Sequence, residues 1–419
     1  MVLVQTVMDG CRDVSYQEIY LEEGTSMKIK VLELPSWYLP QGGHFVRYQA
    51  LALKEHGVEV SILANVTMPW KEYLLHSFEG KYPVRPFFTE EDGITLLRNF
   101  FRPIPKSEIL NIRLWAKRTA ELYDLYASQY GHPDLIHVHS STWGAYAASL
   151  IKAKHHIPYV VTEHRGMYSC LCQMARDFFK REYEYYLREG LSNADYLIPV
   201  GDLLIPKIRE YLTRDVPIRV VSNIVDTDFF VPEKSIPTPH RPFRWISVNG
   251  FYDVKGYDIL LPAFDHLCDK GADVTLTLVG ENFGQRKFQE LLFKCSHQDR
   301  IRFTGELDRG GVRHELQNAD AFVMSSRVEA QPVAILEALS CGLPVAGTEV
   351  IPPYTLPEHL GVRVPVERAD LLSAAMEHIM NHYANYSSEN AHSHAVTIAN
   401  KNTVSMQLID IYQAVIRRD

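Results

Sequence analysis

The chain has little of what marks several large classes of protein. Its 419 residues include six cysteines, and only Cys170 and Cys172 lie close together, at a spacing that fits no common zinc or redox site. No apolar run approaches the roughly 18 residues that a membrane span needs. The first residues carry neither a basic leader nor a long apolar core. These absences predict a cytoplasmic protein with reduced thiols.

The chain also has no excess of positive charge. Its formal net charge is -8, so it has no overall basic field to neutralise phosphates, and nucleic acid is not expected as a partner. No Gly-x-Gly-x-x-Gly opens any expected strand-to-helix unit, which argues against a nicotinamide oxidoreductase. With 46% hydrophobic and 22% charged residues, the composition is that of a globular protein large enough for two domains.

Strand and helix patterns alternate along most of the chain. Residues 1–26 show no periodicity, so we expect an unstructured or non-native extension and a natural start at Met27. A Pro-rich stretch, 231–243, is typical of a linker and separates the alternating regions 27–230 and 244–398. Alternation of this kind predicts an α/β protein with two Rossmann-like, doubly wound parallel-sheet domains and a cleft between them. The expected strands are 27–35, 58–63, 94–97, 135–139, 159–162, 196–200, 218–221, 245–248, 274–279, 301–303, 321–325 and 345–347, and expected helices include 45–56, 143–155 and 404–416.

The most informative stretch, 325–345, reads SSRVEAQPVAILEALSCGLPV. Pro332 fits the first helical position, and Gly342 with Pro344 ends the helix. A helix that starts at the end of a parallel strand has free N–H groups and a positive dipole end, which together bind phosphate. Glu337 lies about 7.5 Å along the axis from Pro332, which suits a ribose. Glu329, on the loop before the helix, is expected on the other side of a diphosphate, beside a sugar.

This stretch resembles the Glu-x7-Glu motif of the retaining glycosyltransferases of family 4, which have the two-domain GT-B fold with a central cleft. The resemblance implies that the first glutamate contacts the donor sugar, that the second contacts the ribose, and that the last helix, 399–419, returns to the first domain. The family usually has Gly-Phe-Gly after the first glutamate, where this chain has Ala330, Gln331 and Pro332. Because proline has no N–H to donate, the phosphate contacts are expected from Gln331, Val333 or Ala334.

The segment SVNGFYDVKGYDIL is similar to the family's Gly-Arg-Leu-x-x-x-Lys-Gly segment. The resemblance implies that Lys255 lies over the diphosphate, where a point charge stabilises the leaving group. The family's arginine is absent, and Asn249 and Gly250 stand in its place. The resemblance also places Leu307 where the family's backbone contacts the nucleobase.

The first domain contributes its own candidates. The segment PSWYLPQGGHFVRYQ looks like a subgroup of the family, which implies a donor contact at Gly43 and acceptor contacts at Gly42 and His44. We expect His137 and His139 to point to opposite faces of one strand. The resemblance places the second histidine near the reacting carbon, so His139 is the catalytic candidate and His137 a packing residue. From the next strand end, His164 and Arg165 are expected to contact the acceptor.

The resemblance implies a retaining glycosyltransferase that needs no cofactor and no metal. Its donor is expected to be a UDP- or GDP-sugar, and its acceptor a hydroxyl of a saccharide or lipid-linked molecule in bacterial surface polysaccharide or glycolipid synthesis. His139, Glu329 and Lys255 are the catalytic candidates. Asp226 and Asp228 match a turn before the linker and are interpreted as structural. Basic and apolar residues alternate over 98–118, which suggests peripheral contact with the inner face of the cell membrane through the first domain.

Other functions remain open at this point. A nucleotide-sugar epimerase or a phosphorylase can share this two-domain architecture. A metal-dependent hydrolase is less favoured, because histidines on opposite faces of one strand make poor ligands for one ion. The ligands of such an ion would be Asp134, His137, His139, Glu163 and His164.

Overall fold

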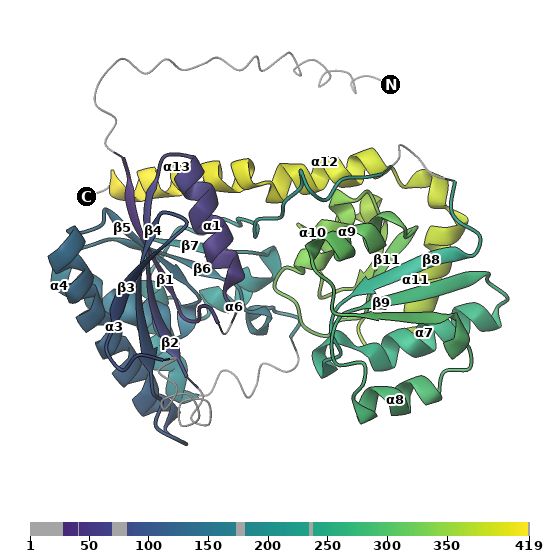
Figure 1. The fold of residues 1–419 in the computed structure, drawn as a ribbon, viewed down its shortest axis with the longest axis horizontal. Coiled ribbons are helices and arrows are strands. Elements are labelled where there is room, and N and C mark those ends of the chain that lie inside the picture. The colour runs from purple at the N-terminus through teal and green to yellow at the C-terminus, as the bar shows by residue number, and fades with distance from the viewer. Residues whose placement is uncertain (1–27, 41, 69–81, 173–180, 234–237, 418–419) are drawn as a thin grey trace, which may run out of the picture.

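A computed structural model of the protein describes residues 28–40, 42–68, 82–172, 181–233 and 238–417. The expected extension, 1–26, lies outside these residues. The described chain forms two α/β domains, each built on one sheet (Figure 1). The predicted fold class is therefore confirmed, because both sheets are parallel over nearly their whole width and have helices between most successive strands.

The first domain has a seven-stranded sheet in the order β3-β4-β2-β1-β5-β6-β7, in which only β3 runs antiparallel to its neighbour. Its strands are β1 Lys30–Pro35, β2 Glu59–Thr67, β3 Phe87–Glu91, β4 Ile94–Phe101, β5 Leu135–His139, β6 Tyr159–Glu163 and β7 Tyr196–Pro199. Its α-helices are α1 His44–Glu55, α3 Glu108–Tyr130, α4 Tyr146–His155, α5 Glu184–Ser192 and α6 Ile205–Arg209.

The second domain has a six-stranded, all-parallel sheet in the order β10-β9-β8-β11-β12-β13. Its strands are β8 Phe243–Val248, β9 Val274–Val279, β10 Ile301–Gly305, β11 Ala321–Met324, β12 Val345–Thr348 and β13 Gly361–Val364. Its α-helices are α7 Tyr257–Asp269, α8 Arg286–Phe293, α9 Arg309–Gln317, α10 Val333–Ser340, α11 Ala369–Asn381 and α12 Ser388–Ala399.

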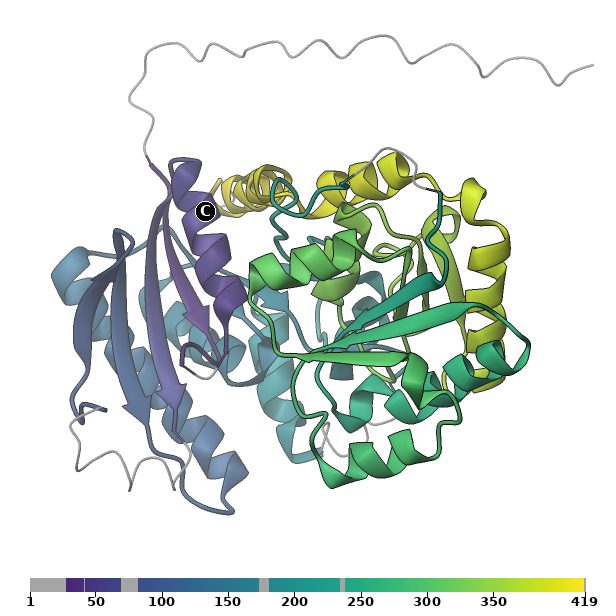
Figure 2. The same ribbon diagram turned by 45° about the vertical axis from the view of Figure 1, so that its right-hand side comes forward.

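The last helix, α13 Lys401–Ile416, packs on the first domain although it follows the second in the chain. Figures 1 and 2 show α12 and α13 (yellow) crossing from one domain to the other. Leu408 and Tyr412 of α13 are buried with Val31 of β1 and Leu53 of α1 in one hydrophobic cluster. Among the described residues, none of the helices is both long enough and apolar enough to cross a bilayer.

Most strands lie where the sequence predicts them, although β2 and β4 extend to Thr67 and Phe101, past the predicted ends at 63 and 97. Residues 218–221 form a single parallel bridge, from Ile218 to Leu197, rather than a strand. Two short strands, β3 and β13, were not predicted. The helix expected to start at Pro332 starts at Val333, because Pro332 has an extended ψ of 106° and serves as the N-cap.

Candidate functional site

Lys255 lies on the turn between β8 and α7, and a glycine brings this turn against β11. Gly256 has φ +66°, and a Cβ on it would lie 2.1 Å from the carbonyl oxygen of Ser325, so only glycine fits. Ser325 also donates its Oγ hydrogen bond to the Lys255 carbonyl at 2.9 Å. The Lys255 Nζ then reaches Glu329 Oε1 at 2.7 Å. Two residues predicted for the donor site are therefore in direct contact.

The loop before α10 contacts residues of the second domain and the segment that follows the first. Glu329 is 8% exposed and Gln331 is 6% exposed. Gln331 Oε1 accepts a hydrogen bond from the backbone N–H of Asn223 at 2.7 Å. Gln331 Nε2 is buried and has no partner within the described part of the chain. The loop thus holds one carboxylate against Lys255 and one amide against the segment that follows the first domain.

A cavity of about 420 Å³ lies between the two domains. Glu337 and Val333 line it from α10, and Arg309 lines it from the start of α9. The remaining wall comes from α1, from the segment 223–228 and from α13. The lining residues on these elements are His44, Phe45, Tyr48, Leu51, Ala52, Glu55, Asn223, Ile224, Val225, Asp226, Asp228 and Lys401. A volume of this size and a mixed apolar and polar lining are typical of a small-molecule site.

Burial dominates the electrostatics of Glu337. Desolvation raises the pKa of its carboxyl to about 7, although the positive charge of Arg309 acts in the opposite direction. Arg309 Nη2 bonds Asp226 Oδ2 at 3.0 Å, and its guanidinium lies 5.0 Å from the ring centre of Phe229. Asp226, interpreted from sequence as a residue of a structural turn, therefore also lines the cavity and pairs with a cation across the domains.

The other candidates in the second domain surround this region. Ala334, partly buried, packs in the α10 core, and Leu307 packs against the same cluster from the loop before α9. Asn249 and Gly250 follow β8, where the Asn249 carbonyl accepts from the Tyr257 hydroxyl at 2.5 Å. Leu307, Asn249 and Gly250 are not among the residues that line the cavity.

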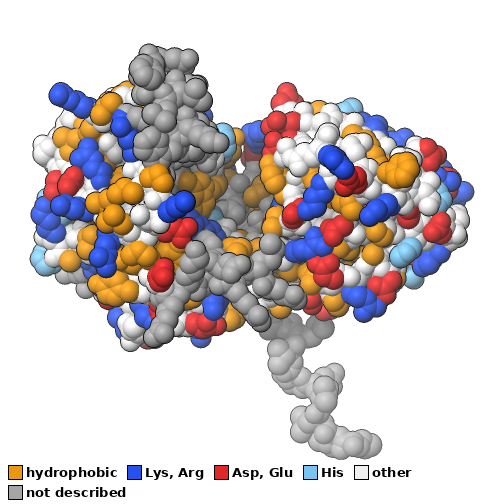
Figure 3. Space-filling view, turned by 90° about the horizontal axis from the view of Figure 1, so that it is seen from below, with side chains coloured by type: hydrophobic (Ala, Val, Ile, Leu, Met, Phe, Trp, Pro, Cys, Tyr) orange, Lys and Arg blue, Asp and Glu red, His pale blue; other side chains and the backbone are white. Residues whose placement is uncertain are grey.

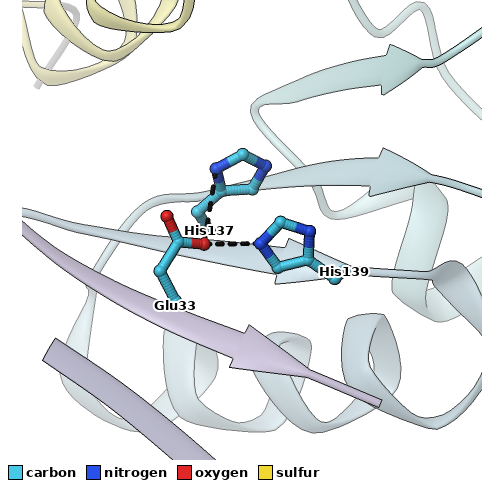
Figure 4. Close-up of side chains that lie close together, drawn as sticks. All are labelled: Glu33, His137 and His139. Carbon is cyan, nitrogen blue, oxygen red and sulfur yellow. Dashed lines mark hydrogen bonds and ion pairs between the residues drawn. The ribbon is translucent and has the colours of Figure 1, made fainter. Parts of the chain in front are cut away.

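In the first domain, His139 belongs to a buried polar network. Its Nε2 lies 2.6 Å from Glu33 Oε2 (Figure 4). Its Nδ1 lies 3.1 Å from His164 Nε2. Glu33 is 0% exposed and His139 is 1% exposed. His164 Nδ1 in turn lies 3.0 Å from Asn223 Oδ1. The network therefore runs from the core of the first domain to the segment that touches Gln331.

The expectation that His137 and His139 face opposite ways is wrong. Successive side chains of a strand alternate, so residues two apart share a face. The two rings stack, with centres 4.6 Å apart and planes 20° apart. His137 is a packing residue as predicted: it is 0% exposed and bonds Tyr412, Thr162 and Gln49.

The two outer histidines of this network are held neutral. Burial, with a smaller effect of neighbouring His139, lowers the pKa of His137 and of His164 well below the ordinary range. His164 also lies against Phe45, with ring centres 4.1 Å apart. These neutral rings act as hydrogen-bonding groups rather than as cations at pH 7.

The residues best placed to hold a metal ion, among those described, are Glu33, His137 and His139, whose ligand atoms lie within 4.8 Å of one another. All three already use these atoms in hydrogen bonds. Stacked rings also direct their lone pairs side by side rather than to one point. The arrangement therefore suits a hydrogen-bonded network better than a metal centre.

The larger ligand set of a metal-dependent hydrolase does not assemble. Asp134 accepts from the Lys30 backbone N–H at the start of β5, and His139 ends the same strand. About 3.3 Å per residue separates them by roughly 16 Å. Glu163 is occupied by the backbone N–H groups of Ser141 and Arg165, each at 2.8 Å.

The glycine pair before α1 has left-handed backbone, with φ of 92° at Gly42 and 83° at Gly43. A Cβ on Gly43 would lie 2.8 Å from the Trp37 carbonyl oxygen, so this position requires glycine. His44 is exposed on the cavity wall. Arg165 lies over the Trp37 ring, 4.9 Å from its centre. The acceptor candidates thus gather at the start of α1 and the end of β6.

Several residues of the site were missed from the sequence: Glu33, Gln49, Asn223 and Arg309. One local signal existed for Glu33, since it is the single charged residue of the apolar run VLELP. The others find their partners far along the chain, as when Gln49 meets His137 88 positions later.

Two family models match the chain. Residues 42–229 match the model described as Glycosyltransferase Family 4. Residues 232–393 match the model described as Glycosyl transferases group 1. The first match contains α1, His137, His139 and His164, and the second contains Lys255, Glu329 and Glu337.

The names of curated relatives also describe sugar transfer. The chain is 33% identical over 144 residues to a human (Homo sapiens) component of phosphatidylinositol N-acetylglucosaminyltransferase, and this match covers 34% of this chain and 29% of that protein. It is 25% identical over 339 residues to the putative teichuronic acid biosynthesis glycosyltransferase TuaC of Bacillus subtilis, which covers 75% and 79% of the two chains. The chain thus spans less than a third of the human relative that it matches.

Solved structures share the fold. Sucrose-phosphate synthase from Thermosynechococcus elongatus superimposes with a TM-score of 0.74 at 18% identity, covering 93% of this chain and all of that one. Anabaena HepE in complex with UDP gives a TM-score of 0.68 at 15% identity, covering 92% of this chain and all of that one. At these identities the likeness establishes the two-domain architecture alone.

Proposed function

Since the chain matches a Glycosyltransferase Family 4 model over 42–229 and a Glycosyl transferases group 1 model over 232–393, we propose that it is a glycosyltransferase that moves a sugar from a nucleoside diphosphate donor with retention of configuration. The acceptor is a hydroxyl of a saccharide or a lipid-linked molecule. One observation carries the proposal: Glu337 lines the interdomain cavity one turn into α10, while the Lys255 and Glu329 pair lies at the loop before the same helix.

The donor fits this arrangement by charge and size. The positive end of α10 and Lys255 attract a diphosphate, and the carboxyl group of Glu337 accepts hydrogen bonds from ribose hydroxyls. The nucleoside occupies the cavity beside Tyr48 and Arg309. Glu329, already held by Lys255, is left to contact the sugar.

The reaction exchanges one bond at the anomeric carbon for another. The bond from that carbon to the diphosphate oxygen breaks, and a bond to the acceptor oxygen forms on the same face of the sugar. The departing diphosphate takes the proton of the acceptor hydroxyl. Lys255 and the start of α10 stabilise the charge that grows on the diphosphate, so no divalent ion is required.

The names of similar proteins support the substrate classes. Structures of HepE were solved with UDP and with UDP-glucose, which favours a UDP-sugar donor over a GDP-sugar. Relatives are named for teichuronic acid and colanic acid biosynthesis, which favours an acceptor in bacterial surface polysaccharide synthesis. We include peripheral membrane contact through the first domain in the proposal, because lipid-linked acceptors lie at a membrane surface.

The proposal is tested by substituting its two central residues. Glu337→Ala and Lys255→Ala should each reduce sugar transfer by about 10²-fold or more, because the first loses the contact with the ribose and the second loses the positive charge beside the diphosphate. Lys270→Ala is the matched control, since Lys270 forms an exposed pair with Glu377 at 2.6 Å, away from the cavity. A UDP-sugar at a hundred times its Kd should stabilise the wild type by about 2.7 kcal/mol in a thermal shift assay.

Transfer, donor hydrolysis and epimerisation are measured together, with and without excess EDTA. Near-normal transfer by both alanine variants would contradict the donor site. Epimerisation without transfer would replace the proposed activity, and complete, metal-reversible loss in EDTA would contradict the metal-independent mechanism.

A further inference from the structure

Glu33 is a carboxylate in the core of the first domain. It is 0% exposed, and the groups that donate to its two oxygens are Gln49 Nε2 at 3.2 Å and His139 Nε2 at 2.6 Å. A buried carboxylate costs several kcal/mol when no cation compensates it. An apolar residue would fill this position of β1 without that cost, as Val31 does two residues earlier on the same face. The carboxylate therefore has a use other than packing.

The hydrogen bonds of Glu33 determine which ring nitrogen of His139 carries the proton. Both carboxylate oxygens accept, so the His139 Nε2 must carry its hydrogen. The other nitrogen, Nδ1, is thereby directed at His164. When the neutral His164 donates from Nε2 to His139, its Nδ1 is an acceptor, so the Asn223 side-chain amide must turn its NH2 group toward it. The Asn223 backbone N–H donates to Gln331 beside Glu329. Glu33 thus holds the Nε2 side of the His139 ring. The Nδ1 side faces His164, from which contacts lead to Gln331 on the loop before α10.

His137 does not share this arrangement, although it stacks on His139. Its Nδ1 lies 2.6 Å from the Tyr412 hydroxyl, and its Nε2 lies 2.7 Å from Thr162 Oγ1. Glu33 Oε2 is 3.7 Å from His137 Nδ1, too far for a hydrogen bond. Removal of the Tyr412 hydroxyl therefore disturbs the same core without touching the partners of His139.

We propose that Glu33 is a positioning residue for sugar transfer: its carboxylate fixes the tautomer and the orientation of the His139 ring, which acts beside the reacting sugar. This inference rests on the proposed function, because it assigns His139 a part in that reaction. An orienting carboxylate behind an imidazole has large effects in other enzymes even though it never touches substrate.

The first test determines directly which nitrogen of the His139 ring is protonated. In a sample labelled with ¹⁵N-histidine, wild-type His139, assigned from the His139→Gln spectrum, should carry its proton on Nε2 and show a strongly downfield N–H signal. Glu33→Gln should abolish this signal. A side-chain amide has one acceptor oxygen and an NH2 group in place of the second, so it cannot accept from Gln49 on one side and from His139 on the other. A wild-type His139 protonated on Nδ1 alone would overturn the proposal, and this measurement needs no variant of Glu33 to fold.

The second test measures kinetics. Glu33→Gln should lower kcat on the order of 10²-fold while the donor KM changes by less than about twofold. The double substitution Glu33→Gln with Gln49→Glu should recover much of kcat, since the amide at position 33 then donates to the new carboxylate and accepts from His139. Tyr412→Phe is the control: it should lower the melting temperature but leave kcat within about twofold.

The outcomes separate the two proposals. Unchanged kcat and an unchanged His139 signal in Glu33→Gln would overturn the positioning role. An equal loss of kcat in Tyr412→Phe would also overturn it, because the effect would then be one of core stability. If the wild type transfers no sugar from any donor, the proposed function fails while the ring measurement still reports on the contact between Glu33 and His139.

Discussion

At the scale of single residues, Glu337 has an acid–base property that can be measured without knowing the substrate. Burial raises the pKa of its carboxyl to about 7, whereas a glutamate in an unfolded chain titrates near about 4.3. Between these two values the folded protein binds more protons than the unfolded one. Stability therefore falls as the pH rises from about 4.3 to 7, and the penalty is complete above pH 7.

We expect Glu337→Gln to be more stable than the wild type at pH 8 and of nearly equal stability at pH 4, below both pKa values. The gain at pH 8 should be on the order of 3–4 kcal/mol, because raising the pKa from about 4.3 to about 7 costs about 1.4 kcal/mol for each pH unit. Urea unfolding at both pH values measures it, with Glu377→Gln on the exposed face of α11 as the control. The same variant should bind the donor more weakly. Equal stabilities at pH 8 would show that Glu337 is not desolvated.

The sequence predicts the residues of the donor site better than the buried residues, such as Glu33, that position other site residues. Glu329, Glu337 and Lys255 stand in recognisable local patterns, and the structure brings Lys255 and Glu329 together. Glu33 carries no such pattern with its partner, because 106 positions separate it from His139. Only the pairing of β1 beside β5 brings the two side chains together.

At the scale of secondary structure, strands that consist of an apolar run were predicted well, whereas the short strands β3 and β13 were not predicted. β5 and β9 have the predicted bounds: all five residues of β5 and four of the six residues of β9 are buried. β3, with the sequence FFTEE, has no alternation and pairs antiparallel at the edge of the sheet, where burial selects side chains weakly. β13 begins at Gly361, where a Cβ would lie 2.1 Å from the Val345 carbonyl oxygen, so packing rather than propensity places it.

The start of α3 is the element that would meet a membrane. Ile104, Leu110 and Leu114 are 41%, 44% and 38% exposed. Lys106 and Arg113 line the surface hollow beside them. Figure 3 shows lysine and arginine side chains interspersed with hydrophobic ones on the first domain, at the left. Three residues of the suggested segment do not belong to this surface: Trp115 and Phe101 are buried, and Arg98 turns inward to the Leu39 carbonyl.

We expect the protein to sediment with anionic vesicles at low salt and not with neutral ones, since each basic residue near an anionic leaflet contributes about 1 kcal/mol. Lys106→Glu combined with Lys117→Glu should weaken binding at least about tenfold. The matched control reverses two exposed lysines of the second domain, Lys270 and Lys287. Equal weakening by both double variants would assign the effect to net charge rather than to α3.

At the scale of the whole molecule, α13 is the connection that makes the two domains interdependent. Asn400, between α12 and α13, anchors the crossing through a 2.7 Å hydrogen bond to Thr227 Oγ1. Lys401 then pairs with Glu55 of α1 at 2.7 Å. The resemblance to the family implied this return, whereas the helical periodicity of 404–416 alone says nothing about which domain receives the helix.

Leu408→Ala should destabilise the first domain by about 2–5 kcal/mol, because Leu408 is 1% exposed in its core. Hydrogen exchange followed by mass spectrometry should then show faster exchange in β1 and β5 than in β8 and β9. Leu316→Ala, which removes an equally buried leucine of α9, should give the reverse order. Equal acceleration in both domains after Leu408→Ala would show that α13 stabilises the molecule as a whole.

The crossing of α13 also constrains how the protein is made. Domains usually fold in turn as the ribosome releases them, starting from the N-terminus. Here the core of the first domain includes Leu408 and Tyr412, which are translated only after the entire second domain. This core therefore cannot be completed before α13 is synthesised. Until then the face of its sheet that carries Val31 is covered by α1 without α13, and His137 lacks its Tyr412 partner. The half of the molecule that is synthesised first is therefore the half that is completed last.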